Sequence, residues 1–340
     1  MSMEVCWRPA VRLGVAALAC AILVQAGLAP APVVRRPPTK ILVPDEDSGQ
    51  QQPVPQSQIP TIRVETKLVN VPVNVVDANG APLGGLKAED FEILEDGRPQ
   101  KIAYFEKESS TPLSIVLAID SSESVLRDER LEKSAAKRFI EALMREQDEM
   151  ALMDFSDTVR EIVPFTNQVR RIEDGLNTLV RGNETSLFDA IYLASEQLAA
   201  TKSDAGRRRV LVLITDGEDT LRKTRYGQAL EQAQRAGAMI YSIIIVPIAA
   251  DAGRSVGGEH ALIQMSADTG GKFYYVQNRS DLDPAFARVS DDLRTQYVLG
   301  YYAPKGARDS FRRITVRIKN PELSGGYEVR SRSGYYADAR

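Results

Sequence analysis

Three loops of the sequence carry oxygen-bearing side chains, two of them directly after apolar segments and one before a predicted helix. The first holds Asp120, Ser122 and Ser124 at alternate positions, the second supplies Thr185, and the third supplies Asp216. Ligands of open α/β sheets bind at the carboxyl ends of the strands, where side chains from different strands can meet. Two carboxylates, three hydroxyl groups and water form an octahedral set of oxygen ligands, which suits Mg²⁺, Mn²⁺ or Ca²⁺ and not zinc or copper. The sequence therefore predicts a site for a hard divalent cation.

The region that must position these side chains spans residues 111–294 and alternates strand and helix patterns. Residues 114–119 and 210–214 are continuous apolar runs, as expected of parallel strands covered on both faces. Residues 127–145 and 187–199 instead have apolar side chains at helical spacing. This alternation predicts the α/β fold class, with an open, mostly parallel sheet and helices on both sides.

The two flanks of this region, residues 61–110 and 295–340, contain strand patterns only. In the first flank, residues 91–95 and 101–105 are expected to form a hairpin around the turn at Asp96 and Gly97. Because both flanks are β-rich, we hypothesise that they form one β-sandwich into which the α/β domain is inserted.

The N-terminal 60 residues predict export. Residues 1–26 combine a basic flank, an uncharged aliphatic run at 13–24 and small residues, which is typical of a secretory signal peptide cleaved after Ala26. An uncleaved N-terminal anchor is the alternative, and it would be the chain's only link to a membrane. Residues 27–60 are proline-rich and predict a flexible linker. We therefore expect a periplasmic or extracellular, cell-surface protein.

Composition narrows the function classes. The 340 residues carry a net charge of −3, which gives no electrostatic reason to expect nucleic acid as a partner. With two cysteines and one histidine, a zinc site built from Cys and His and a cysteine nucleophile are nearly excluded, and a Ser-His-acid triad would depend on His260. The sequence also lacks a Walker loop, a GxSxG motif and an Asp-x-Asp phosphatase motif. We therefore expect a protein that is not an enzyme.

The loops described above resemble a known family. Asp120, Ser122 and Ser124, with Thr185 and Asp216, match the metal-ion-dependent adhesion site of von Willebrand factor A domains, and the resemblance covers about residues 112–294. It implies a Rossmann-like fold. It also implies that Ser122, Ser124 and Thr185 bind the cation directly, that the two aspartates act largely through water, and that a partner's Asp or Glu carboxylate completes the metal shell.

The full layout resembles a bacterial family of VWFA-related proteins first described from Acidobacteria, over most of residues 61–337. This resemblance implies location more than activity. We expect an exported, divalent-cation-dependent protein-binding or adhesion module. Two alternatives remain: a structural envelope component with a vestigial metal site, and a metal-assisted hydrolase. The oligomeric state is not predicted.

Two groups of charged residues are interpreted as solvated surface. Arg207 to Arg209 precede a strand and are expected at a solvated sheet edge. The acids around the candidate site are expected to solvate its loops, although a second cation is the alternative; they are Glu123, Glu184, Glu218 and Asp219.

Overall fold

The computed structural model describes residues 68–78, 80–107, 110–123, 125, 129–201, 207–246, 255–304, 309–320 and 326–337. The elements below all belong to one compact unit, Arg63–Arg340. The predicted signal peptide (1–26), the predicted linker (27–60) and the candidate ligand Ser124 lie outside the described residues.

The centre of the α/β domain is a six-stranded sheet in the order β10-β9-β8-β5-β6-β7. All neighbouring strands are parallel except β7, which runs antiparallel to β6. Every residue of β5 is buried, because β5 has a neighbour on each side and helices on both faces. The strands are β5 (Leu113–Asp120), β6 (Glu149–Phe155), β7 (Val159–Thr166), β8 (Arg208–Thr215), β9 (Ala238–Ile245) and β10 (Phe273–Val276).

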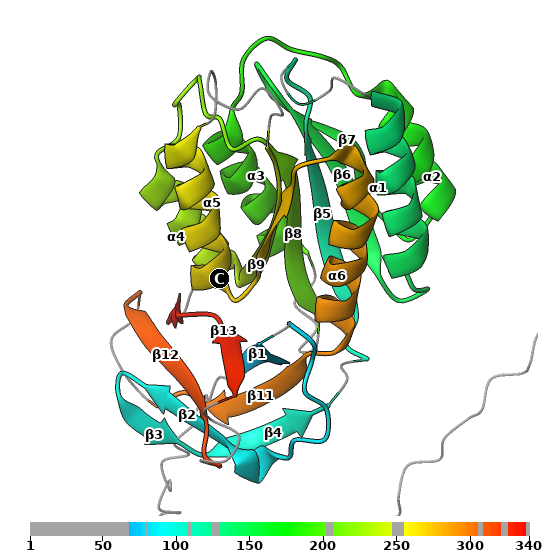
Figure 1. The fold of residues 1–340 in the computed structure, drawn as a ribbon. Coiled ribbons are helices and arrows are strands. Elements are labelled where there is room, and N and C mark those ends of the chain that lie inside the picture. The colour runs from blue at the N-terminus through cyan, green and yellow to red at the C-terminus, as the bar shows by residue number, and fades with distance from the viewer. Residues whose placement is uncertain are drawn as a thin grey trace, which may run out of the picture. The chain divides into compact units, whose positions relative to one another are not determined.

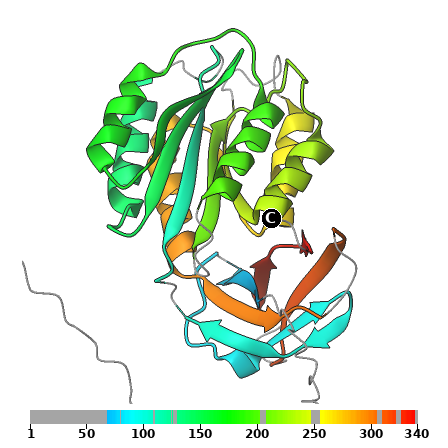
Figure 2. The same ribbon diagram turned by 180° about the vertical axis from the view of Figure 1, so that it is seen from behind.

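Helices cover both faces of this sheet (Figures 1 and 2). α1, α2 and α6 enclose one apolar core with the sheet, and α3, α4 and α5 enclose a second. The helices are α1 (Glu129–Leu143), α2 (Val169–Gly175), α3 (Leu187–Ala200), α4 (Tyr226–Ala236), α5 (Val256–Thr269) and α6 (Leu282–Arg294). None of the described helices has the length and apolar character needed to span a membrane. The predicted open, mostly parallel sheet is confirmed.

The flanks form two antiparallel four-stranded sheets, β13-β1-β11-β4 and β14-β12-β2-β3. Each sheet contains strands from before and after the α/β domain, and both contribute to one apolar core that includes Val71, Phe91, Leu299 and Ile314. The strands are β1 (Leu68–Asp77), β2 (Phe91–Glu95), β3 (Arg98–Gln100), β4 (Ile102–Glu106), β11 (Tyr297–Tyr302), β12 (Phe311–Ile318), β13 (Tyr327–Ser331) and β14 (Gly334–Tyr336). The chain thus leaves this sandwich at β4 and re-enters it at β11, which is the arrangement that the insertion hypothesis describes.

The expected hairpin has a different second strand. Asp96 and Gly97 form its turn with φ angles of 47° and 78°, the conformation of a tight hairpin turn. The partner of β2 is β3, however, and not residues 101–105. Those residues form β4, which pairs with β11 in the other sheet and adds Ile102 and Phe105 to the sandwich core. The strand itself was predicted correctly, but the sheet to which it belongs was predicted wrongly.

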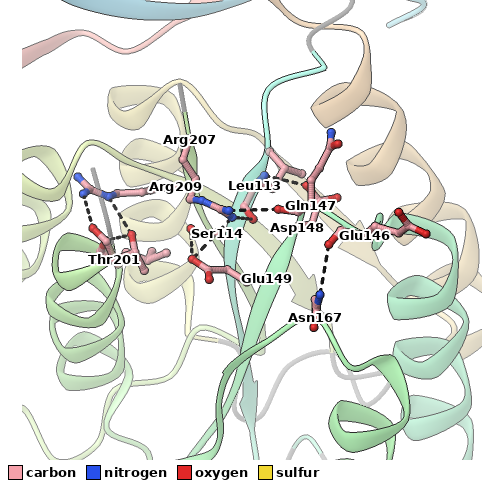
Figure 3. Close-up of polar contacts among 11 residues, drawn as sticks. Leu113, Ser114, Glu146, Gln147, Asp148, Glu149, Asn167, Thr201, Arg207 and Arg209 are labelled. Atoms are coloured by element: carbon pink, nitrogen blue, oxygen red, sulfur yellow. Dashed lines mark hydrogen bonds and ion pairs between the residues drawn. The ribbon is translucent and has the colours of Figure 1, made fainter. Parts of the chain in front are cut away.

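Arg207 to Arg209 lie at a sheet edge, as expected, but the interpretation that this group is solvated was wrong for Arg208. Arg207 donates hydrogen bonds to the carbonyls of Leu113 (3.0 Å) and Gln147 (3.2 Å), at the edge where β5 and β8 begin (Figure 3). Arg208 is only 6% exposed and donates to the Leu293 carbonyl at 2.8 Å. These guanidinium groups satisfy carbonyls at the N-terminal edge of the sheet, because each offers several donors in a fixed geometry.

A buried carboxylate joins the two flanks inside the sandwich. Glu95 on β2 is 3% exposed. It accepts hydrogen bonds from the hydroxyls of Tyr301 (2.6 Å) and Tyr335 (3.0 Å) and from the Arg312 guanidinium (3.0 Å). The three donors lie on β11, β14 and β12, so one side chain of the first flank contacts three strands of the second.

We predict that Glu95→Ala lowers the free energy of unfolding by about 3 to 5 kcal/mol, because it leaves the Arg312 charge buried without its partner. Guanidinium-induced unfolding measures the change. The control is Glu92→Ala, on the same strand with a side chain that is not fully buried. Equal effects of the two substitutions would contradict the prediction.

Candidate metal centre

Asp120 is the last residue of β5, and its side chain is fully buried. One carboxylate oxygen, Oδ2, accepts a hydrogen bond from Thr215 Oγ1 at 2.7 Å. The other, Oδ1, accepts from the backbone N–H of Ser122 at 3.0 Å, and the Ser122 side chain also hydrogen-bonds the carboxylate. Thr215 ends the neighbouring strand β8 and directly precedes Asp216. The loop of Asp120 and Ser122 is therefore joined to the loop of Asp216.

The electrostatics of this carboxylate favour a cation. The pKa of Asp120 is raised to about 7, chiefly by burial; the Asp216 charge also raises it, while hydrogen bonds from Ser122 and Thr215 oppose the shift. Within the described residues, no lysine or arginine forms an ion pair with Asp120 or Asp216. Two neighbouring carboxylates without a basic partner repel each other, and a bound cation would remove that repulsion.

The loop of Asp216 is held from two sides. The Asp216 carboxylate accepts a hydrogen bond from the Glu218 N–H at 3.1 Å, and Gly217 has a φ of 84°, which favours glycine. The first turn of α5 packs directly on this loop, since a Cβ added to Gly258 would lie 1.6 Å from the Gly217 carbonyl oxygen. A glycine at 258 is thus required by the close approach of two backbones.

Thr185, which is 2% exposed, is fixed by the end of the same loop. Its N–H donates to Thr220 Oγ1 at 2.8 Å, and its carbonyl accepts from the N–H groups of Thr220 (3.0 Å) and Leu221 (3.2 Å). Both backbone groups of Thr185 are therefore occupied by the loop that begins at Asp216.

Thr185 is also connected to the loop after β5. Gly182 donates its N–H to the Ser121 carbonyl at 3.1 Å, and its own carbonyl accepts from the Glu123 N–H at 3.1 Å. A Cβ on Gly182 would lie 2.5 Å from Ser156 Oγ, so this contact also needs a glycine. The three candidate loops thus contact one another through their backbones.

The structure brings Asp120, Ser122 and Asp216 together and places Thr185 on a loop bonded to both of theirs. Ser124 lies outside the described residues. The assignment of these five side chains as metal ligands stays a prediction.

Sequence reasoning missed the roles of Asp219 and Thr220. Asp219 was interpreted as a solvated acid, but its Oδ1 accepts the N–H of Leu187 at 2.9 Å and so caps the start of α3. Burial raises the pKa of Asp219, and hydrogen bonds from the Phe188 and Leu187 N–H groups lower it. Local spacing could not show this cap, because the two partners are 32 residues apart. Glu123 and Glu184 are exposed, as expected.

The donor set fits a hard cation. The carboxylates of Asp120 and Asp216 and the hydroxyls of Ser122 and Thr185 belong to buried residues, and all are oxygen donors. Within the described part of the chain, no three side chains from His, Cys, Asp and Glu gather in a way that could hold a metal.

Comparisons with known proteins agree with this fold. The family model of the von Willebrand factor type A domain matches residues 114–288. Among solved structures, BatB from Bacteroides thetaiotaomicron is similar, with 19% identity over 53% of this chain and 98% of that chain and a TM-score of 0.42. A von Willebrand factor type A protein from Catenulispora acidiphila has 12% identity over 73% of this chain and 74% of that chain, with a TM-score of 0.46.

A third similar structure is proximal thread matrix protein 1 from the mussel byssus, solved with zinc in its metal-ion-dependent adhesion site (MIDAS) motif. It has 16% identity over 55% of this chain and 49% of that chain, with a TM-score of 0.46. A search of curated proteins gave no match. The family model spans just over half of the 340 residues and includes β5, β8 and the loops that follow them. The chain therefore belongs to the von Willebrand factor type A domain family.

Proposed function

We propose that this protein is an exported module that binds a protein partner through a divalent cation. The observation that carries the proposal is the buried Asp120 carboxylate, which lies close to Asp216, is surrounded by hydroxyl and N–H donors, and has no basic partner among the described residues. A buried carboxylate is unfavourable unless its charge is paired, and a bound cation would supply that pairing.

Two kinds of side chain would hold the cation, hydroxyl groups and carboxylates. Ser122, Ser124 and Thr185 would offer neutral hydroxyl oxygens, while Asp120 and Asp216 would supply negative charge from behind them. When bound, Mg²⁺, Mn²⁺ or Ca²⁺ supplies an electrophilic centre that attracts a further carboxylate. Because the direct ligands are mostly neutral, the charge of the cation stays incompletely compensated, and an Asp or Glu of the partner can complete its shell.

Export is the second element of the proposal and rests on the sequence. Residues 1–26 would direct the chain out of the cytoplasm. The proline-rich residues 27–60 would form a flexible linker before the folded unit. Binding in the periplasm or at the cell surface follows from this layout.

Calorimetric titration of Mg²⁺, Mn²⁺ and Ca²⁺ into the full chain tests the centre. We predict saturable binding in the original chain and its loss in Asp120→Ala, because that substitution removes the buried charge that the cation compensates. The control is Asp283→Ala, which removes an exposed carboxylate on α6 that pairs with Arg138 of α1. Binding that survives in Asp120→Ala, or a chain that binds none of the three ions, would reject the proposal and favour a structural role.

A second prediction concerns the support of Thr185. Thr220→Val keeps the shape of the side chain but removes the Oγ1 acceptor of the Thr185 N–H. Loss of a group that orients a metal ligand typically weakens metal binding by about 10- to 100-fold, and we expect a change of that size in Mg²⁺ affinity.

Calorimetry compares Thr220→Val with Thr220→Ser, which keeps the acceptor and should bind Mg²⁺ nearly as well as the original chain. Thr178→Val is the matched control, since the Thr178 hydroxyl donates to the Gly175 carbonyl at the end of α2. The positioning role is rejected if Thr220→Val and Thr220→Ser bind Mg²⁺ equally well.

A further inference from the structure

Ser186, the residue after Thr185, has a buried hydroxyl group with no hydrogen-bond partner among the described residues. Its side chain is 1% exposed, and its Oγ is an unpaired buried atom. Three other buried serines of the α/β domain do find partners. Ser195 Oγ donates to the Ile191 carbonyl at 2.7 Å, and the hydroxyls of Ser242 and Ser266 lie 3.1 Å apart. A buried hydroxyl without a partner is costly, so its presence needs an explanation.

The position of Ser186 would normally provide a partner. Ser186 precedes the first residue of α3, where a serine hydroxyl usually accepts an N–H of the first helical turn. Its side chain makes no such bond, although its carbonyl accepts the Ala190 N–H at 3.0 Å. Asp219 instead accepts the Leu187 N–H at 2.9 Å. The cap of α3 therefore comes from the Asp216 loop, and the Ser186 hydroxyl is left available.

The loop around Ser186 is fixed independently of that hydroxyl. Thr220 holds both backbone groups of Thr185, on one side of Ser186, and Asp219 holds Leu187 on the other. A hydroxyl with no task in the helix or the loop thus lies next to a candidate metal ligand. Oxygen atoms of a hydrated cation are a suitable partner, because a serine hydroxyl can both donate to and accept from water.

We infer that Ser186 is a further residue of the metal centre, whose hydroxyl hydrogen-bonds a water molecule of the bound cation. The inference rests on the proposed function, since it assumes that Asp120 and its neighbours hold a divalent cation. Ser186 is additional to the five predicted ligands, and it acts on the hydration shell of the ion.

Ser186→Ala and Ser195→Ala, two serines at buried positions of the same helix region, give a matched test in the full chain. Mg²⁺ affinity is measured by calorimetry, and thermal unfolding is measured in the presence of EDTA. For Ser186→Ala we expect Mg²⁺ affinity about 10-fold weaker, as for other groups that contact a metal's ligands. Its metal-free Tm should be unchanged or higher, because the substitution removes an unpaired buried hydroxyl.

For Ser195→Ala we expect the opposite result, a lower metal-free Tm with unchanged Mg²⁺ affinity, because its hydroxyl has a partner only within α3. The inference is overturned if Ser186→Ala binds Mg²⁺ as well as the original chain does. If Asp120→Ala meanwhile abolishes binding, the proposed function stands and only the role of Ser186 is lost. An original chain that binds none of Mg²⁺, Mn²⁺ and Ca²⁺ overturns both.

Discussion

The burial of β5 is the constraint on which the rest of the α/β domain depends. From Ile115 to Ile119 the strand carries only apolar side chains, because parallel neighbours and helices exclude water from both of its faces. Its carboxyl end is therefore where an acid can appear, and Asp120 stands there. Even at this position the carboxylate is fully buried, and its hydrogen bonds come from Thr215 and Ser122. The candidate site thus begins at the carboxyl end of β5, directly after its apolar residues.

The loops that surround Asp120 are held together by hydrogen bonds between residues of the chain itself. Gly182 exchanges backbone hydrogen bonds with Ser121 and Glu123, and Thr220 occupies both backbone groups of Thr185. Close contacts at Gly182 and Gly258 keep the loops in place from outside. Loops that are already fixed have less conformational entropy to lose on binding. The burial of the Asp120 carboxylate beside Asp216 is the unfavourable feature of this arrangement, because neither acid has a basic partner among the described residues.

The sequence indicated those features that depend on neighbouring residues. The apolar run of β5, the helical spacing of α3 and the turn at Asp96 and Gly97 are local signals, and each element formed as expected. Features that depend on distant pairing were missed. In the sequence Asp219 is indistinguishable from other acidic loop residues, because its partner Leu187 is brought beside it only by the fold.

Arg208 and β4 show the same limit in a different form. Arg208 stands among three consecutive arginines, which is typical of solvated surface, and its partner Leu293 lies 85 residues further on. The strand pattern of β4 was visible, but it contains no sign that the chain changes sheets at Lys101, because that choice depends on β11. For the candidate site, the sequence supplied the residue types and the strand ends, and only the fold shows that their loops are bonded together.

The sandwich contacts the α/β domain at the edge of the sheet opposite the candidate centre. Helices between parallel strands run opposite to the strands, so their C-terminal ends lie at the sheet edge away from Asp120. The sandwich contacts these ends: Ser333 donates to the carbonyl of Asp268 on α5, and Arg330 pairs with Asp292 on α6 at 3.1 Å. Arg235, in the last turn of α4, likewise pairs with Asp309. Since these contacts fall on the edge opposite the carboxyl ends of the strands, the sandwich holds the α/β domain at the edge away from the loops of Asp120, Thr185 and Asp216.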